Sequence, residues 1–177
     1  MTAPKHTAGQ YQRRDSQRWH ELECGRATPD ADEQRLIDAV AAAVDSGLFY
    51  SDEVFTHVAA ALGDWLPPNA GGPDDMTRSI RTERGDNGME VYYARRVLDR
   101  TRKLARDREI IDHLTIGQEF KNLSFVVNYK RRKYTRGIVS ALDRQHGTVS
   151  LAVIGRGRGA NGIMTMGAAI LAREAGL

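Results

Sequence analysis

The spacing of hydrophobic residues changes near residue 114 of this chain. Before that point, apolar residues recur every three or four positions, as on one face of a helix. Beyond it they alternate with polar residues, as in half-buried strands. A chain that places its helices before its strands folds as α+β, because alternating βαβ units would interleave the two patterns. We therefore expect an α+β protein, with N-terminal helices, then a small antiparallel β meander and a C-terminal helix.

The N-terminal half contains three segments with helical spacing. The first covers residues 32–46, and the second follows a short turn and covers residues 51–62. A third, longer helix is expected over residues 89–111. Residues 64–88 lie between the second and third helices and include LPPNAGGPDD and RTERGDNG, which are rich in turn-forming residues. We expect a long loop there.

The C-terminal half contains three segments with strand-like alternation: residues 123–129, 134–142 and 148–154. Within them, Ile138, Ser140 and Leu142 are expected on one side of their strand. A loop of glycine and arginine, GRGRGANG, follows the third segment. The last helix is expected over residues 163–175.

These elements suggest three regions along the chain. Residues 1–29 are polar and are expected to form a flexible N-terminal arm, in which Trp19 and Leu22 of a short helix could dock on the body. Residues 30–113 form the helical region. Residues 114–177 form the β meander with its Gly/Arg loop and terminal helix, and we expect them to build one compact domain with the helical region.

The charged residues are distributed unevenly between the halves. Residues 27–90 contain 4 Lys and Arg and 13 Asp and Glu, whereas residues 91–158 contain 16 Lys and Arg and 6 Asp and Glu. Such an asymmetry indicates an anionic partner for the basic half. The alternative is that the two halves attract one another, or that each charged face is simply solvated.

Several classes of protein are disfavoured by composition. Cys24 is the only cysteine, so no internal disulfide can form, and a reducing compartment is the simplest setting. The first residues carry charges without a following apolar stretch, unlike a secretory signal. No run approaches the roughly 18 apolar residues that a membrane span needs. We therefore expect a cytoplasmic protein that has no membrane partner.

The order of the elements resembles the winged-helix variant of the helix-turn-helix family. Two helices joined by a short turn precede a cationic third helix, and two strands then surround Lys130, Arg131, Arg132 and Lys133. The resemblance covers residues 32–142. It implies that the third helix enters the major groove of DNA and that the hairpin touches the adjoining backbone or minor groove. Residues 64–88 depart from the family, which has a tight turn at that place.

Three groups of cations are the candidate nucleic-acid-binding residues. They are Arg95, Arg96, Arg100, Arg102 and Lys103 on the third helix, Lys130, Arg131, Arg132 and Lys133 at the tip of the hairpin, and Arg156 and Arg158 in the Gly/Arg loop. Each phosphate that a cation neutralises releases condensed counterions, and an arginine can also donate to O6 and N7 of guanine. Tyr129 and Tyr134 flank the hairpin cations and are available for stacking or packing. The alternative is a solvated helix face and an edge strand guarded by charge.

We therefore expect a protein that binds nucleic acid, with duplex DNA favoured, such as a bacterial or phage transcription regulator or DNA-maintenance factor. A homodimer would let it span two half-sites. The rival hypothesis is an assembly or adaptor protein whose opposite charges contact neighbouring copies or a protein partner. In that case residues 64–88 and the arm would order on binding.

A third hypothesis is an enzyme that holds a phosphate-bearing ligand in the Gly/Arg loop. Gly157, Gly159 and Gly162 fit GxGxxG between an expected strand and an expected helix, where backbone amides could seat a phosphate. The rest of a dinucleotide site, a second parallel strand with its acid, is missing. His20 and Cys24 lack a second pair of metal ligands nearby. We expect no catalytic residues, no cofactor and no metal.

Overall fold

The structure is a computed structural model that describes residues 11–12, 14–66, 85–127, 129–155 and 161–177. The chain forms two compact units, residues 1–101 and 102–177. The boundary lies inside helix α5 (Gly85–Asp112). The sequence placed it after residue 113, at the end of that helix. The expectation that the helical and β parts form one compact domain stays a prediction.

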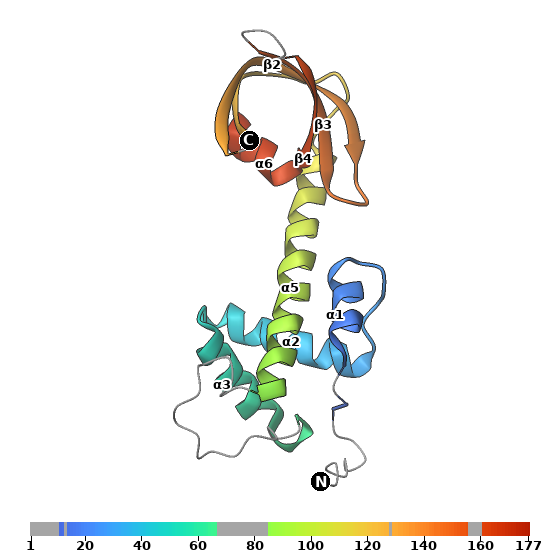
Figure 1. Cartoon of the computed structure of the whole chain (residues 1–177), viewed down its shortest axis with the longest axis vertical. Coiled ribbons are helices and arrows are strands. Elements are labelled where there is room, and N and C mark those ends of the chain that lie inside the picture. The colour runs from blue at the N-terminus through green and yellow to red at the C-terminus, as the bar shows by residue number, and fades with distance from the viewer. Residues whose placement is uncertain (1–10, 13, 67–84, 128, 156–160) are drawn as a thin grey trace. The chain divides into compact units, whose positions relative to one another are not determined.

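The first unit is helical (Figure 1). It contains α1 (Ser16–Glu23), α2 (Ala31–Asp45), α3 (Ser51–Leu62), the short 3-10 helix η1 (Gly63–Trp65) and the N-terminal part of α5. Asp30 caps α2 with a capping box, in which its side chain and that of Glu33 accept one another's backbone N–H groups. The apolar stripes of α2, α3 and α5 meet in one core, which includes Leu36, Val40, Val54, Val58, Val91 and Ala94.

The described part of the expected N-terminal arm is packed into this core. Trp19 is only 1% exposed, and Tyr11 and Leu22 are also buried. The backbone N–H of Tyr11 donates to the carbonyl of Trp65 at 2.8 Å. The docking of Trp19 and Leu22 is therefore confirmed. The description of residues 11–12 and 14–29 as part of a flexible arm is wrong, because Tyr11 and Trp19 contribute to the core. Residues 1–10 lie outside the described residues.

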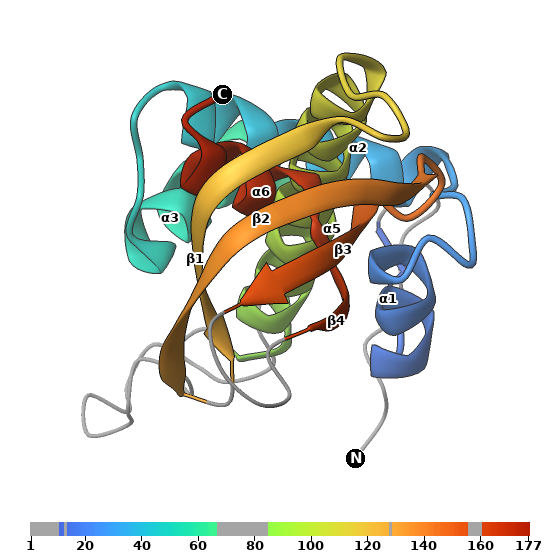
Figure 2. The same ribbon diagram turned by 90° about the horizontal axis from the view of Figure 1, so that it is seen from above.

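The second unit is a curved antiparallel sheet whose concave side is filled by a helix. Its strands are β1 (Glu119–Val127), β2 (Lys130–Asp143), β3 (Thr148–Gly155) and β4 (Gly162–Gly167), in that order across the sheet, followed by α6 (Ala168–Ala175). Figures 1 and 2 show the strands bending around α6. Leu123, Val139, Leu151 and Leu171 are among the buried residues that fill the space between them. The α+β class and the meander are confirmed.

The fourth strand corrects the expected end of the chain. Residues 163–167 were expected to begin the last helix, but they pair antiparallel with β3, and the helix begins at Ala168. Met164 and Met166 pack against the core, while Ile163 is exposed. A short apolar run satisfies helical and strand periodicity equally well, so sequence spacing alone could not separate them.

The cations expected at the tip of the hairpin lie within a strand instead. β2 begins at Lys130, and Lys130 and Lys133 pair with Val127 and Ser124 of β1. β1 ends at Val127, two residues of sequence before β2, and Tyr129 has a left-handed φ of 61°. A two-residue connection leaves no room for a four-residue cationic tip, so this part of the prediction is wrong.

Irregularities in β1 and β2 change which side chains face the core. Asn122 has a φ of 56°, and the pairing of β2 with β3 shifts between Tyr134 and Arg136 and again between Val139 and Ala141. These bulges reset the alternation of side chains. Val139 is consequently buried, so the expected face of Ile138, Ser140 and Leu142 is not continuous.

Candidate functional site

The expected cations at the N-terminal side of α5 are held by contacts within the first unit. Arg95 donates to the carbonyl of Phe49 at 2.9 Å and lies 3.8 Å from the carboxylate of Asp99. Arg96 pairs with the carboxylate of Glu23 at 2.7 Å. These contacts join α5 to the turn after α2 and to α1. They partly neutralise both cations.

Further along α5, the cations of the second unit are also engaged. Lys103 lies 3.1 Å from the carboxylate of Asp107, which is buried and accepts the backbone N–H of Ala169 at 2.7 Å. Arg102 is engaged as well. Among the five helix cations expected to bind nucleic acid, Arg100 alone is exposed without a partner in the described part of the chain.

The first four cations of β2 differ from most of the expected cations of α5 in having no partner among the described residues. Lys130, Arg131, Arg132 and Lys133, which we call the basic strand, are all exposed. None of their side chains has a hydrogen bond or an ion pair with another described residue. Their full charge therefore faces solvent. Tyr129, just before them, is fully exposed, whereas Tyr134, just after them, is buried in the core and is not available for stacking.

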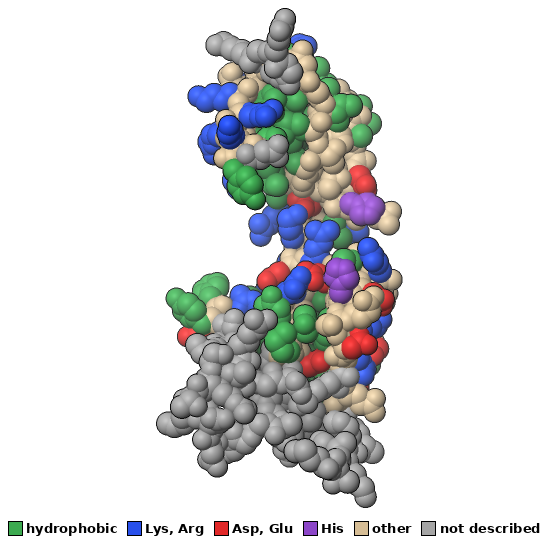
Figure 3. Space-filling view, viewed as in Figure 1, with side chains coloured by type: hydrophobic (Ala, Val, Ile, Leu, Met, Phe, Trp, Pro, Cys, Tyr) green, Lys and Arg blue, Asp and Glu red, His purple; other side chains and the backbone are tan. Residues whose placement is uncertain are grey.

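Strand alternation divides the basic strand between the two faces of the sheet. Lys133 pairs with Ser124, and their neighbours Tyr134 and Leu123 are buried in the core around α6. Because successive side chains point to opposite faces, Lys133 and Arg131 lie on the outer face of the sheet. Figure 3 shows Lys and Arg side chains gathered beside hydrophobic ones on one side of this unit. Val126, which pairs with Arg131, is an exposed apolar residue of β1.

A hollow lies next to the basic strand. It has a volume of about 380 Å³ and is lined by Asn122, Leu123, Ser124, Lys133, Tyr134 and Thr135. Lys133 is the only charged residue among them. The hydroxyl of Thr135 donates to the carbonyl of Ile154 at 2.9 Å, but Ser124 Oγ is buried and has no hydrogen-bond partner among the described residues. Sequence reasoning missed this hollow, although an asparagine is an unusual residue inside a strand.

The Gly/Arg loop ends in a strand and not in a helix. Arg156 and Arg158 lie outside the described residues. The residues on either side pair with neighbours in the sheet: Gly155 with Tyr134, and Gly162 with Val153. The dinucleotide fingerprint requires a helix after its glycines. Because β4 occupies that place, the expected phosphate seat at a helix N-terminus is not formed.

Of the residues that flank the loop, Gly155 lies next to the basic strand. It pairs with Tyr134, which directly follows Lys133. Gly162 pairs with Val153, which lies across from Gly137 of β2.

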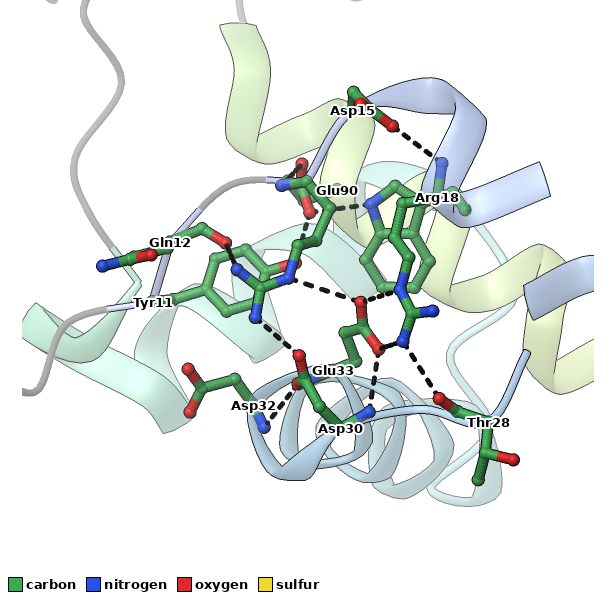
Figure 4. Close-up of polar contacts among 11 residues, drawn as sticks. Tyr11, Gln12, Asp15, Arg18, Thr28, Asp30, Asp32, Glu33 and Glu90 are labelled. Carbon is green, nitrogen blue, oxygen red and sulfur yellow. Dashed lines mark hydrogen bonds and ion pairs between the residues drawn. The ribbon is translucent and has the colours of Figure 1, made fainter. Parts of the chain in front are cut away.

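The first unit contains two buried carboxylates that sequence reasoning did not single out (Figure 4). Glu90 accepts the hydroxyl of Tyr11 at 2.5 Å and the indole N–H of Trp19 at 2.9 Å. Burial raises the pKa of Tyr11 above its usual range, and the hydrogen bond to Glu90 raises it further. These contacts are consistent with a structural role, because they fix the N-terminal segment on α5.

The second buried carboxylate is that of Glu33. It accepts hydrogen bonds from Arg18 Nη2 at 2.6 Å and from Arg14 Nε at 3.3 Å. Burial by itself would raise the pKa of Glu33, but the hydrogen bonds from Arg18 and from the backbone N–H of Asp30 outweigh burial and hold it below its usual value. The carboxylate of Glu33 thus has its hydrogen-bond partners within the first unit.

Comparisons with known proteins add no functional information: no family model, no curated protein and no solved structure matches this chain. Within the described ranges, no three His, Cys, Asp or Glu side chains gather as metal ligands. No described helix is long and apolar enough to cross a lipid bilayer. The geometry of the basic strand and its hollow therefore carries the functional argument.

Proposed function

We propose that this protein binds nucleic acid through its second unit, with the basic strand contacting backbone phosphates. One observation carries the proposal: Lys130, Arg131, Arg132 and Lys133 are consecutive, exposed and without an acidic partner among the described residues. Cations that are not already paired release the most counterions when they meet phosphates, and this release supplies sequence-independent affinity.

The distribution of charge between the units supports the same site. Residues 102–177 contain 14 Lys and Arg and 6 Asp and Glu, whereas residues 1–101 contain 12 and 17. A polyanion is therefore attracted to the second unit and repelled by the first. The proposal relies on the basic strand and not on α5, because Arg95, Arg96 and Lys103 are already paired with carboxylates.

The winged-helix resemblance adds little support to this proposal. In that family the hairpin is the wing of the helical domain. Here the buried residues of the hairpin, such as Leu123 and Tyr134, belong to a core with Leu171 of α6. The core of α2, α3 and the N-terminal part of α5 is a separate cluster. The resemblance is not confirmed, and the proposal stands on exposed charge alone.

A salt series tests the proposal. Fluorescence anisotropy with labelled oligonucleotides should show binding that weakens linearly in a plot of log affinity against log salt. The double variant Lys130→Gln/Arg131→Gln should lower the slope by about 0.7 to 0.9 for each lost phosphate contact. Arg173→Gln is the control, since Arg173 is an exposed cation on α6 whose partner is the neighbouring Glu174. Absence of binding at low salt, or equal slopes for the two variants, would refute the proposal.

A second candidate function is assembly through the first unit. Phe49 and Tyr50, in the turn between α2 and α3, are 71% and 74% exposed. Adjacent large aromatic residues in this position are typical of protein contacts. If they form an interface between copies, Phe49→Ser/Tyr50→Ser should lower the mass measured by light scattering from dimer to monomer. A monomeric wild-type protein would remove the homodimer from consideration.

A further inference from the structure

The hollow beside the basic strand suggests which form of nucleic acid is bound. Its lining offers the amide of Asn122, the hydroxyl of Ser124 and a single cation, Lys133. We propose that this hollow takes an unpaired nucleobase, so that the protein binds single-stranded nucleic acid in preference to a duplex. This inference rests on the proposed function, because the basic strand must hold the backbone that carries the base.

The size and position of the hollow fit a base better than a phosphate. Its volume of about 380 Å³ lies within the range of sites for small organic molecules, about 300 to 1,000 Å³. Ser124 and Lys133, which line it, pair with one another on the outer face of the sheet, and the core residues Leu123 and Tyr134 complete its lining. A base inside a duplex is stacked and paired, so it cannot enter a recess of this kind unless it is unstacked.

The polar groups of the hollow match the edge of a base. A side-chain amide offers both a donor and an acceptor, and Asn122 presents one from a left-handed backbone position that asparagine tolerates. Ser124 Oγ is buried without a hydrogen-bond partner among the described residues. A buried polar atom without a partner is unfavourable, and a base edge that reached Ser124 Oγ would supply the missing partner.

The backbone on either side of the base would meet cations. Lys133 lines the hollow itself, and Arg131 lies on the same outer face, two residues and about 6.6 Å farther along β2. Val126 is exposed opposite Arg131 and offers apolar surface to a neighbouring base. Phosphates and bases thus have separate partners on one face of the sheet, and single-strand binders likewise combine cations for the backbone with side chains that contact bases.

Three ligands of equal length test the inference: a single strand, the same backbone with abasic sites, and the corresponding duplex. The intact single strand should bind about tenfold more tightly than the abasic strand, a difference equivalent to about 1.4 kcal/mol. It should also bind more tightly than the duplex at the same salt concentration. Equal affinity for the abasic and intact strands would overturn the inference.

Two variants of the hollow refine the test. Ser124→Ala removes the unpartnered hydroxyl, and Asn122→Gly removes the amide while keeping a residue that tolerates φ of 56°. Both should weaken binding of the intact strand about threefold to tenfold and leave the abasic strand unaffected. Ser140→Ala is the control, because Ser140 lies on β2 away from the hollow and already donates to the carbonyl of Ser150 at 3.1 Å.

The outcomes separate the inference from the proposed function. If Lys130→Gln/Arg131→Gln weakens all three ligands while Ser124→Ala and Asn122→Gly change none, the hollow has no role and the basic strand remains the site. If the wild-type protein binds none of the ligands, both the inference and the proposed function are refuted. Thermal unfolding checks that each variant is folded, and Ser124→Ala should not lower the melting temperature.

Discussion

Single buried polar residues determine how the N-terminal segment is held on the first unit. Glu90 lies on α5 and accepts hydrogen bonds from Tyr11 and Trp19, which come from a segment far away in sequence. The sequence indicated that Trp19 would dock, because it is an apolar residue in a short amphipathic helix. It could not indicate Glu90, because an acid in a long charged helix is usually exposed.

Replacing Glu90 should destabilise the first unit. Glu90→Leu removes the acceptor and leaves the Tyr11 hydroxyl and the Trp19 indole N–H buried without partners. We expect a loss of about 2 to 4 kcal/mol in the free energy of unfolding, and a smaller loss for Glu90→Gln, which keeps an acceptor. Denaturant unfolding measures the loss, with the exposed Glu53 of α3, in the same unit, as the control position. A Glu90→Leu protein as stable as Glu53→Leu would contradict this role.

The buried carboxylate of Glu33 should make the first unit sensitive to acid. The pKa of Glu33 is lower in the folded protein than its usual value of 4.5. A group with a depressed folded pKa contributes stability that is present above the unfolded pKa and is lost as pH falls through the folded pKa. The melting temperature should therefore drop as pH falls below about 4.5. Glu33→Gln should lower the melting temperature at pH 7 and flatten its dependence on pH.

At the scale of elements, long periodic segments were predictable and local irregularities were not. The spacing of apolar residues indicated α2, α3 and the first three strands, since a core on one face imposes that spacing. It did not indicate β4, because the run from Ile163 is too short to show a period. The hollow was also unpredictable, since it depends on the backbone of Asn122 and on its neighbours across the ladder.

A close contact inside the sheet gives a prediction at this scale. A Cβ at Gly137 would lie 2.7 Å from Leu123 Cδ1, and Leu123 is fully buried. Gly137→Ala should therefore force the core of the second unit to repack, at a cost of about 1 to 3 kcal/mol. Gly162→Ala is the matched control, because a Cβ there meets no atom within 4 Å. Equal stability of the two variants, measured by thermal unfolding, would show that Leu123 moves aside freely.

At the scale of the whole molecule, the sequence revealed the sign of the net charge of each half, but not which cations remain unpaired. Carboxylates four residues away on α5 reach Arg95 and Lys103, so helical spacing pairs cations that the sequence alone suggests are free. The basic strand has no acid among its own neighbours. Its partners across the ladder are Val127, Val126, Phe125 and Ser124, and none of these is charged. The cations of the basic strand therefore remain candidates for nucleic-acid binding, whereas most of the expected cations on α5 are already paired.

The two cores predict how the whole chain unfolds. Trp19 and Trp65 are the only tryptophans, and both belong to the first unit, so tryptophan emission reports that unit alone. No described residue is shared by the two buried clusters. We expect Glu90→Leu to shift the transition seen by tryptophan emission, and Gly137→Ala to shift a separate transition seen by circular dichroism. If each variant instead shifts both signals together, the chain unfolds as one cooperative domain, as the sequence first suggested. Helix α5 would then be the element that couples the cores, because among the described helices it alone supplies buried residues to both, Val91 to the first and Ile111 to the second.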